Sequence, residues 1–542
     1  MGTRWARSRW TWPLVASLLA SVGAAACNVL IGLEPPPPAA DGGHGGGASG
    51  SGGATGDAAP DTTEPPAVCV PLDGGAEDAA ADARPTYAAL LPLTGSDAGG
   101  GWDWFFLGED AGQPLNFSGG TFDGRYVYFA ARGTVVARYD TLGGFGDPLA
   151  WSTFSVGTKP LGLAGGFEGA VFDGRYVYFV PYAAGSTRES VVARFDTQAP
   201  SQALGDLAAW TAYDVSLLTP DGGPAARGFF GGTFDGRYVY FVPHNDGVPD
   251  GRVVRYDTLP LLDAGSPDLP DAAADAGDAG HPADAGADAG AHDAGAEDAG
   301  TDAGEPLSFG DPALWATFDV GTVSPEATGF CGAVFTGDAV YFVPNVNGAY
   351  GSVVHGGASG TVARLGVDGG SFTDAGSWST FDLTQANGLA YGFVGGAFDG
   401  RYVYLVPNAT GIVTRLDTTA SALDVGAAAN YDLTRIPGAD ASAFHFQGAS
   451  FDGRFVYLIP VQNAFATVVR YDTLSPFTAD CAWSTVDLTQ VDAGGLSPEN
   501  FNGAVFDGEY LYLIPDTNGL VGRFRARTPR SLPALPAFHG GF

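Results

Sequence analysis

The sequence predicts an all-β protein, a seven-bladed β-propeller made of four-stranded antiparallel blades. The first observation is a phrase that returns seven times, best seen as GAVFDGRYVYFVP followed by VVRYDT. The second is its spacing: without the low-complexity segments, each copy has roughly 55 residues, which is typical of repeat folds. The phenylalanines that anchor the copies are Phe122, Phe172, Phe234, Phe335, Phe398, Phe451 and Phe506.

The second copy shows how the first two strands arise. Residues 169–172 form a short apolar run, and Asp173-Gly174 follows it. An Asp-Gly pair between apolar runs predicts a tight hairpin, because both positions tolerate positive φ. Residues 176–180 are aromatic and β-branched, which favours a strand. Pro181 ends this strand, since proline has no N–H to donate to a ladder.

Two further runs complete the predicted blade. Residues 191–197 form a third strand, and a fourth begins at Trp210. The second strand is apolar at successive positions instead of alternating, which indicates burial on both faces. Each sheet therefore packs between two others, as in a radial propeller. An open solenoid would need atypical capping repeats, and none is visible.

The two ends of the repeat region predict how the ring closes. The last copy ends with a third strand at residues 521–525, and no Trp-containing fourth strand follows it. An orphan strand-like run, residues 102–107, precedes the first copy. We expect this N-terminal strand to complete the last blade.

The layout resembles the kelch motif over residues 102–528. The shared features are small residues opening strand one, Tyr-x-Tyr on strand two, Tyr-Asp-Thr closing strand three and Trp on strand four. The resemblance implies propeller architecture. It does not extend to the Gly-Gly pair that ends strand two in kelch repeats, because most copies have Val-Pro or Ile-Pro there, as at Val180-Pro181 and Ile514-Pro515.

The N-terminal residues predict export. Residues 1–26 contain three arginines, an apolar stretch and Ala24-Ala25-Ala26, which is the pattern of a signal peptide. Cys27 follows directly, so the site resembles a bacterial lipobox, and Cys27 is the predicted lipidation site. Cleavage of an ordinary secreted protein at the same bond remains an alternative. Residues 27–98 are rich in Pro, Gly and Ala and are expected to form a disordered tether.

The remaining composition divides the chain further. Residues 99–530 hold the predicted propeller, and residues 531–542 form a tail. Residues 259–305 are built on Asp-Ala-Gly and predict a disordered acidic insertion. The net charge is −35, which argues against a nucleic-acid partner, since phosphates would be repelled.

Three cysteines follow Cys27, namely Cys69, Cys331 and Cys481. They are far apart and lack the CxxC spacing of a zinc site. Export permits one disulfide. The odd number leaves one thiol unpaired within the chain, and the sequence does not assign the pair.

Residues that recur in every copy are interpreted as scaffold. An arginine follows the Asp-Gly turn in most copies, and an aspartate ends strand three. A ring of such pairs suggests an anionic-ligand site, but a residue needed in every blade is better explained by the same local ion pair in each. The Tyr-x-Tyr stripes are likewise assigned to the core between blades instead of a sugar-stacking platform.

The segments that differ between copies are the candidate ligand face. They are the loops between strands two and three and the residues that open strand one. Carboxylates, amides and histidines there suit a polar ligand such as a sugar, or a calcium ion. No other cofactor is indicated by the sequence. The alternative is that Asp-Gly and Asn-Gly are turn chemistry and the histidines are solvated. The candidate residues are Glu168, His244, Asp246, His445, Gln447 and Asn502.

No catalytic motif is recognisable, so whether the protein is an enzyme is left open. The leading hypothesis is an exported, lipid-anchored, monomeric propeller that binds a protein or a glycan at the cell envelope. It touches the membrane only through its lipid anchor, as an outer-membrane or cell-surface lipoprotein, or is secreted. One alternative is a glycan-cleaving hydrolase or lyase with carboxylates at the channel mouth, since propellers host many functions. Another is a structural surface protein.

Overall fold

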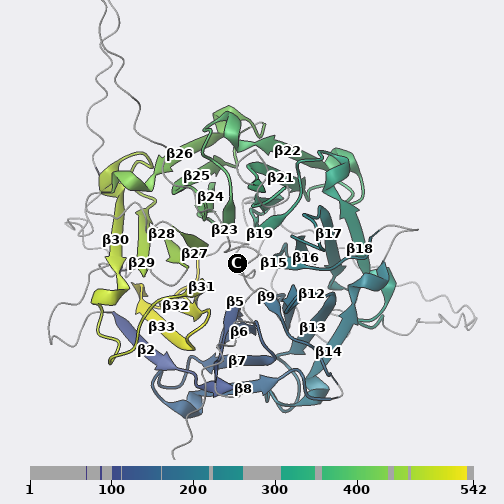
Figure 1. Ribbon diagram of the computed structural model, residues 1–542, viewed down its shortest axis with the longest axis vertical. Helices are drawn as coiled ribbons and strands as arrows, with labels where there is room; N and C mark the ends of the chain where they lie inside the picture. Colours follow the sequence, from purple (N-terminus) through teal and green to yellow (C-terminus); the bar gives the residue numbers. More distant parts are fainter. Residues whose placement is uncertain are drawn as a thin grey trace, which may run out of the picture.

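The computed structural model describes residue 69 and residues 86–87, 101–110, 113–159, 161–218, 224–259, 307–347, 357–420, 422–436, 445–461 and 466–533. The predicted signal peptide, with Cys27, lies outside these residues, as does nearly all of the acidic insertion. Seven four-stranded antiparallel sheets stand around one axis (Figure 1). The all-β, seven-bladed propeller is therefore confirmed, and the described residues contain helical structure essentially only as short 3-10 turns.

The first six blades run from the axis to the rim in chain order, and the seventh takes its outermost strand from the start of the repeat region. The innermost strands all begin and end with phenylalanine and are β5 (Phe117–Phe122), β9 (Phe167–Phe172), β15 (Phe229–Phe234), β19 (Phe330–Phe335), β23 (Phe393–Phe398), β27 (Phe446–Phe451) and β31 (Phe501–Phe506). The second strands are β6 (Tyr126–Ala131), β10 (Tyr176–Pro181), β16 (Tyr238–Pro243), β20 (Ala339–Pro344), β24 (Tyr402–Pro407), β28 (Phe455–Pro460) and β32 (Tyr510–Pro515).

The outer half of each blade is equally regular. The third strands are β7 (Val135–Asp140), β13 (Val191–Asp196), β17 (Arg252–Asp257), β21 (Thr361–Gly366), β25 (Ile412–Asp417), β29 (Thr467–Asp472) and β33 (Leu520–Arg525). The outermost strands are β8 (Trp151–Ser155), β14 (Trp210–Asp214), β18 (Trp315–Asp319), β22 (Trp378–Asp382), β26 (Ala428–Asp432), β30 (Trp483–Asp487) and β2 (Trp102–Phe106).

The hairpin between the first two strands forms where it was predicted, but with a different backbone. The Asp173 N–H donates to the Tyr176 carbonyl at 3.2 Å, so the two central residues are Gly174 and Arg175. Gly174 has φ +102°, whereas Asp173 is not in the positive region, which matches the glycine-first pattern of type II′ turns. Asp173 instead acts through its carboxylate, which accepts from the N–H groups of Arg175 and Tyr176 and from the Tyr178 hydroxyl.

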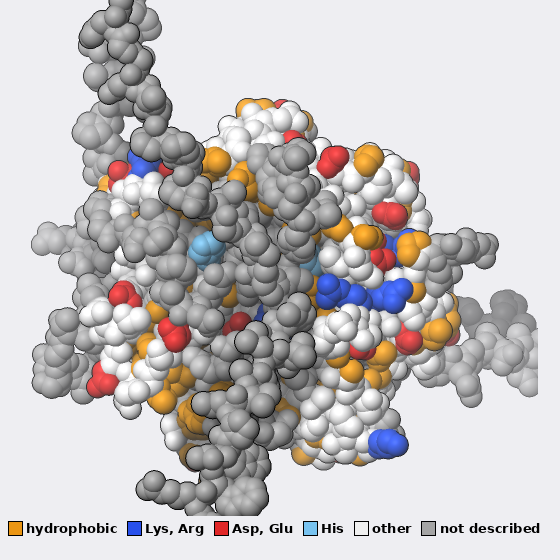
Figure 2. All heavy atoms as spheres, viewed as in Figure 1, with side chains coloured by type: hydrophobic (Ala, Val, Ile, Leu, Met, Phe, Trp, Pro, Cys, Tyr) orange, Lys and Arg blue, Asp and Glu red, His pale blue; other side chains and the backbone are white. Residues whose placement is uncertain are grey.

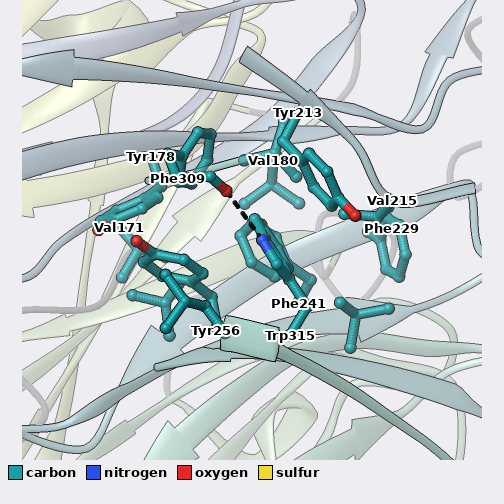
Figure 3. Close-up of a cluster of buried hydrophobic side chains, with 14 of the residues drawn as sticks. Val171, Tyr178, Val180, Tyr213, Val215, Phe229, Phe241, Tyr256, Phe309 and Trp315 are labelled. Atoms are coloured by element: carbon teal, nitrogen blue, oxygen red, sulfur yellow. Dashed lines mark hydrogen bonds between the residues drawn. The ribbon is translucent and has the colours of Figure 1, made fainter. Parts of the chain in front are cut away.

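Neighbouring blades bury their facing side chains. Between the second and third blades, Val171 and Tyr178 belong to one buried cluster with Phe229, Phe241 and Trp315 (Figure 3). The Trp315 Nε1–H donates to the Phe309 carbonyl at 3.0 Å, so the indole is buried without losing its hydrogen bond. Each fully buried large side chain contributes about 1.5–3 kcal/mol. The absence of alternation in the second strand is explained by this burial on both faces.

The recurring Arg and Asp form one local ion pair in each of five blades, as the scaffold interpretation predicted. In the sixth blade the Arg454 guanidinium lies 2.7 Å from Asp472 Oδ2, and both side chains are nearly buried. The second tyrosine of each Tyr-x-Tyr stripe is buried and donates to the turn aspartate, as Tyr457 does to Asp452. The corresponding ion pairs are Arg125–Asp140, Arg175–Asp196, Arg237–Asp257 and Arg401–Asp417.

The N-terminal strand closes the ring, as predicted. Strand β2 pairs with β33 in antiparallel register, from Trp102 opposite Phe524 to Phe106 opposite Leu520. The pairing places β2 at the rim of the last blade (Figure 1). Ring closure therefore joins segments from opposite ends of the chain through backbone hydrogen bonds.

Two contacts bring residues from the expected tether onto the blades. Cys69 forms a disulfide with Cys481, and the buried Cys331 is not part of it. Strand β1 (Thr86–Tyr87) pairs with β34 (Arg527–Thr528), and the Tyr87 ring contacts Phe455 edge-on at 5.6 Å between centroids. The pair of cysteines that the sequence left open is thus assigned by the fold.

Candidate functional site

Each innermost strand has a β-bulge near its start. The residue before the glycine of this bulge is the one considered at the axis in each blade. In the second blade Phe167 pairs with Pro181 and Ala170 with Phe179, so Glu168 and Gly169 face a single partner residue. Gly169 has φ +96°, which a side chain would disfavour. The same register shift and a positive-φ glycine occur in all seven blades. The residues before these glycines, here called the axial ring, are Ser118, Glu168, Phe230, Cys331, Val394, Gln447 and Asn502.

A second set of residues follows the end of each second strand. The backbone N–H of each donates to the segment just before the innermost strand of the same blade, as His244 does to the Gly228 carbonyl at 3.2 Å. Their side chains reach the next blade: Asn408 Nδ2 donates to the Phe446 carbonyl at 3.0 Å. These residues, here called the loop ring, are Arg132, Tyr182, His244, Asn345, Asn408, Val461 and Asp516.

The two rings share a polar arc over the sixth, seventh, first and second blades. The Arg132 guanidinium lies 3.1 Å from Glu168 Oε1 and 2.8 Å from Asp516 Oδ1. Ser118 Oγ donates to Glu168 Oε2. Burial raises the pKa of Asp516, and the charge of Arg132 opposes that rise. One cation thus compensates two nearly buried carboxylates.

Gln447 and Asn502 continue this arc with unsatisfied amides. Both side chains are fully buried, and neither the oxygen nor the nitrogen of either amide has a hydrogen-bond partner within the described residues. A buried polar group without a partner costs about 1–3 kcal/mol. Water or a ligand can supply these partners, so the polar arc has unused hydrogen-bonding capacity.

The opposite arc of the axial ring is apolar, whereas the loop ring has His244, Asn345 and Asn408 there. Phe230, Cys331 and Val394 pack with Tyr182 in one buried cluster. His244 lies among them, with Nδ1 3.5 Å from Cys331 Sγ and its ring 5.6 Å from that of Phe230. The axial ring is therefore amphipathic: its hydroxyl, carboxylate and amide groups lie in one arc, and its aromatic, thiol and aliphatic groups in the other.

The structure brings most of the predicted residues together but not all. Glu168, Gln447 and Asn502 belong to the axial ring and His244 to the loop ring. Asp246 is partly exposed, and its carboxylate accepts from the Val248 N–H at 3.2 Å, which is turn chemistry. His445 precedes β27, with Nδ1 2.7 Å from the Asn408 carbonyl oxygen.

Sequence reasoning missed Arg132 and Tyr182 and saw Asp516 only as part of a variable loop. The sequence contains a signal for these three residues, because each directly follows the end of a second strand. Arg132 escaped notice since its copy has Ala130-Ala131 where the others have Val-Pro or Ile-Pro.

Charge on the viewed face of the ring is dispersed. Figure 2 shows acidic side chains spread over several blades and a run of basic side chains to the right of the centre. Among the described residues, no group of three or more His, Cys, Asp or Glu side chains is placed to share a metal ion. No helix in that part of the chain has the length and hydropathy to cross a membrane.

Comparison with known proteins gives limited information. No protein-family model matches this chain, and neither does any curated protein. Among solved structures, "Streptogramin B lyase structure" is 12% identical, with a TM-score of 0.43, and the match covers 79% of this chain and 98% of the other. The WD40 repeats of RRP9 are 10% identical, with a TM-score of 0.45 and coverage of 78% and 98%.

A third match is the Myceliophteria thermophila Cps50 (Swd1) β-propeller domain. It is 8% identical, with a TM-score of 0.44, and the match covers 78% of this chain and all of that domain. Likeness at this level indicates nothing about function. The seven-bladed fold is defined by the strand pairing within this chain.

Proposed function

We propose that this protein is a binding module at the cell envelope. Its axial site, formed by the axial ring and the loop ring, binds the end of a glycan. The observation that carries the proposal is the pair of fully buried, unpartnered amides of Gln447 and Asn502. Each amide offers donors and an acceptor, which suits ligand hydroxyl groups.

The amphipathic character of the axis favours a sugar over a fully charged or fully apolar ligand. A sugar ring has hydroxyl groups at its edge and C–H groups on its face. Glu168 and the two amides suit the edge, and the Tyr182 and Phe230 rings suit the face. Few polar groups in an otherwise apolar site are typical of small-ligand recognition.

Export and anchoring are part of the same proposal. The pattern of residues 1–26 and the position of Cys27 support a lipid-anchored protein that acts as a monomer outside the cytoplasm. The repeat is of kelch-like type, with Val-Pro or Ile-Pro replacing Gly-Gly. A protein loop that inserts an amide or hydroxyl side chain is the other kind of partner with this chemistry.

The test uses variants that remove the amides without removing volume. Asn502→Leu and Gln447→Met replace buried polar groups by apolar groups of similar shape, so we expect unchanged or higher stability. We also expect loss of the melting-temperature increase that a binding glycan produces in a thermal-shift screen. Asn408→Leu is the matched control, because its amide is already bonded to Phe446 and its loss should lower stability while glycan binding remains.

The result that would contradict the proposal is a Gln447→Met, Asn502→Leu double variant that binds every glycan as the parent does. Binding of an envelope protein instead, lost in the same double variant, would keep the site and change the ligand class.

A second candidate is glycan cleavage, favoured by one observation. Glu168 and Asp516 are two nearly buried carboxylates held by one cation, and burial raises the pKa of Asp516. Two carboxylates in different environments are the usual requirement for general acid–base chemistry on a glycosidic bond. Polysaccharide cleavage that is lost in Glu168→Gln and Asp516→Asn but retained in Asp246→Asn would establish it.

A further inference from the structure

A pocket of about 320 Å³ lies between the third and fourth blades. Its walls include Arg237 and Tyr238 at the start of β16, Arg255 on β17, and Leu365 and Phe372 from the fourth blade. The loop ring follows the other end of β16, and a six-residue strand spans about 20 Å. The pocket therefore lies at the turn end of the blades, away from the axial site.

Two residues of the fourth blade distinguish this junction. At the position of Leu365, the first, third and sixth blades have tyrosine, and the second, fifth and seventh have phenylalanine or leucine. The next residue is Gly366, where five blades have the aspartate of the local ion pair. The fourth blade thus lacks both the phenol found in three blades and the carboxylate found in five.

Without a phenol at this position, Arg255 lacks the partner that three equivalent arginines have. In the preceding junction Arg194 Nη1 lies 3.2 Å from the Tyr256 hydroxyl, and Arg415 and Arg523 contact tyrosine hydroxyls at 3.4 Å. Leu365 offers Arg255 no such group. On β18 the residue opposite Arg255 is Ala316, which has no hydroxyl either.

Arg255 is nevertheless held in a fixed place. Its guanidinium carbon lies 3.9 Å from the centre of the Tyr238 ring and 4.5 Å from that of Phe372. It also hydrogen-bonds the Tyr240 hydroxyl. Among the described residues it has no carboxylate partner, so a positioned cation borders a pocket of ligand size.

The acidic group in the pocket wall does not compete for Arg255. Asp235 Oδ1 accepts from the N–H groups of Arg237 and Tyr238, at 2.8 and 2.6 Å, and Oδ2 accepts from the Tyr240 hydroxyl at 2.7 Å. Arg237 is half-exposed and paired with Asp257. Arg255 is therefore the group available to an anion.

We propose that this pocket binds a small organic monocarboxylate with a flat apolar body. The ligand carboxylate pairs with Arg255, and its body fills the space that the tyrosine ring occupies in other blades, against Leu365 and Phe372. Planar guanidinium–carboxylate pairing favours a carboxylate over a neutral ligand of the same shape. The site is separate from the proposed glycan site and does not depend on it.

The test measures benzoate and benzamide binding to the full chain by ligand-observed NMR titration. Benzoate has the charge and the flat body, and benzamide has the same shape without the charge. We expect a benzoate Kd on the order of 1 mM. Benzamide should bind at least about tenfold more weakly, because a hydrogen bond to a charged group is lost. Equal affinities, or no benzoate binding at about 20 mM, would overturn the proposal.

Three variants assign the site. Leu365→Tyr introduces the residue that the first, third and sixth blades have there, so it should fold, fill the pocket and abolish benzoate binding. Arg255→Gln should remove the preference for benzoate over benzamide. Arg415→Gln is the matched control, since its arginine is already bonded to Tyr471, and benzoate binding should be unchanged. Unchanged benzoate affinity in Leu365→Tyr would place the binding elsewhere and refute the proposal.

Discussion

Arg132 and Asp516 form an ion pair across the junction between the first and last blades, with 2.8 Å between Nη1 and Oδ1. The same guanidinium contacts Glu168 of the second blade. One side chain therefore links three consecutive blades at the axis. Strand β2 joins the ends of the ring at the rim, and Arg132 joins them at the centre.

We expect Arg132→Met to lower the free energy of unfolding by about 3 kcal/mol, because it leaves two nearly buried carboxylates without a counter-charge. Without the cation, the pKa of Asp516 rises further in the folded state. The folded protein then binds more protons than the unfolded chain, so stability falls as pH rises. Urea unfolding should show a larger loss at pH 8 than at pH 5. A second change, Asp516→Asn, should restore part of the stability, and an equal loss at both pH values would contradict this account.

The turn glycines are predicted to be required for their backbone conformation alone. Gly124 has φ +98° and open space where a Cβ would lie, so Gly124→Ala should cost about 1–2 kcal/mol through backbone strain. Gly146, also exposed and with open space, has no positive φ. Gly146→Ala should therefore be neutral or stabilise by up to about 1 kcal/mol. Chemical denaturation of the two variants measures the difference, and equal effects would exclude the explanation.

The Arg401–Asp417 pair predicts a pH-dependent contribution to stability. The hydrogen bond from Arg401 lowers the pKa of Asp417 to about 2, below its value in the unfolded chain. The stabilisation is therefore present above pH 4 and lost as pH falls through 2. Because the pair is exposed, Asp417→Asn should cost about 0.5–1 kcal/mol at pH 7. The cost should shrink toward zero at pH 2, as measured by urea unfolding at both pH values, and a cost that persists at pH 2 would argue against the ion pair.

The Cys69–Cys481 disulfide predicts a specific pattern of thiol labelling. In protein lacking residues 1–27, alkylation in denaturant without reductant should label only Cys331. Cys481→Ser should cost about 2 kcal/mol and expose the chain around Cys69 to proteases, since the crosslink no longer holds it to the sixth blade. Mass spectrometry of the alkylated protein and limited proteolysis measure both effects. Labelling of Cys69 or Cys481 in the unreduced parent would contradict the pairing.

Comparison of the seven copies predicted part of the candidate site. Glu168, Gln447 and Asn502 were recognised because they differ between copies at one position of a regular strand. Their burial was not predictable, since the sequence does not show that the following glycine forms a bulge. Asp246 lies in a turn, where its carboxylate accepts from the Val248 N–H, and an Asp-Gly pair that serves a turn is indistinguishable in sequence from one that serves a ligand.

The sequence by itself determined the number of blades, the four strands of each and the N-terminal strand that closes the ring, because these depend on local apolar patterns and turn residues repeated seven times. Only the tertiary structure decided the cysteine pair, the Arg132–Asp516 contact and the pocket beside Arg255. These depend on which side chains of neighbouring blades face one another. Such contacts join residues far apart in the chain, and no local pattern encodes them.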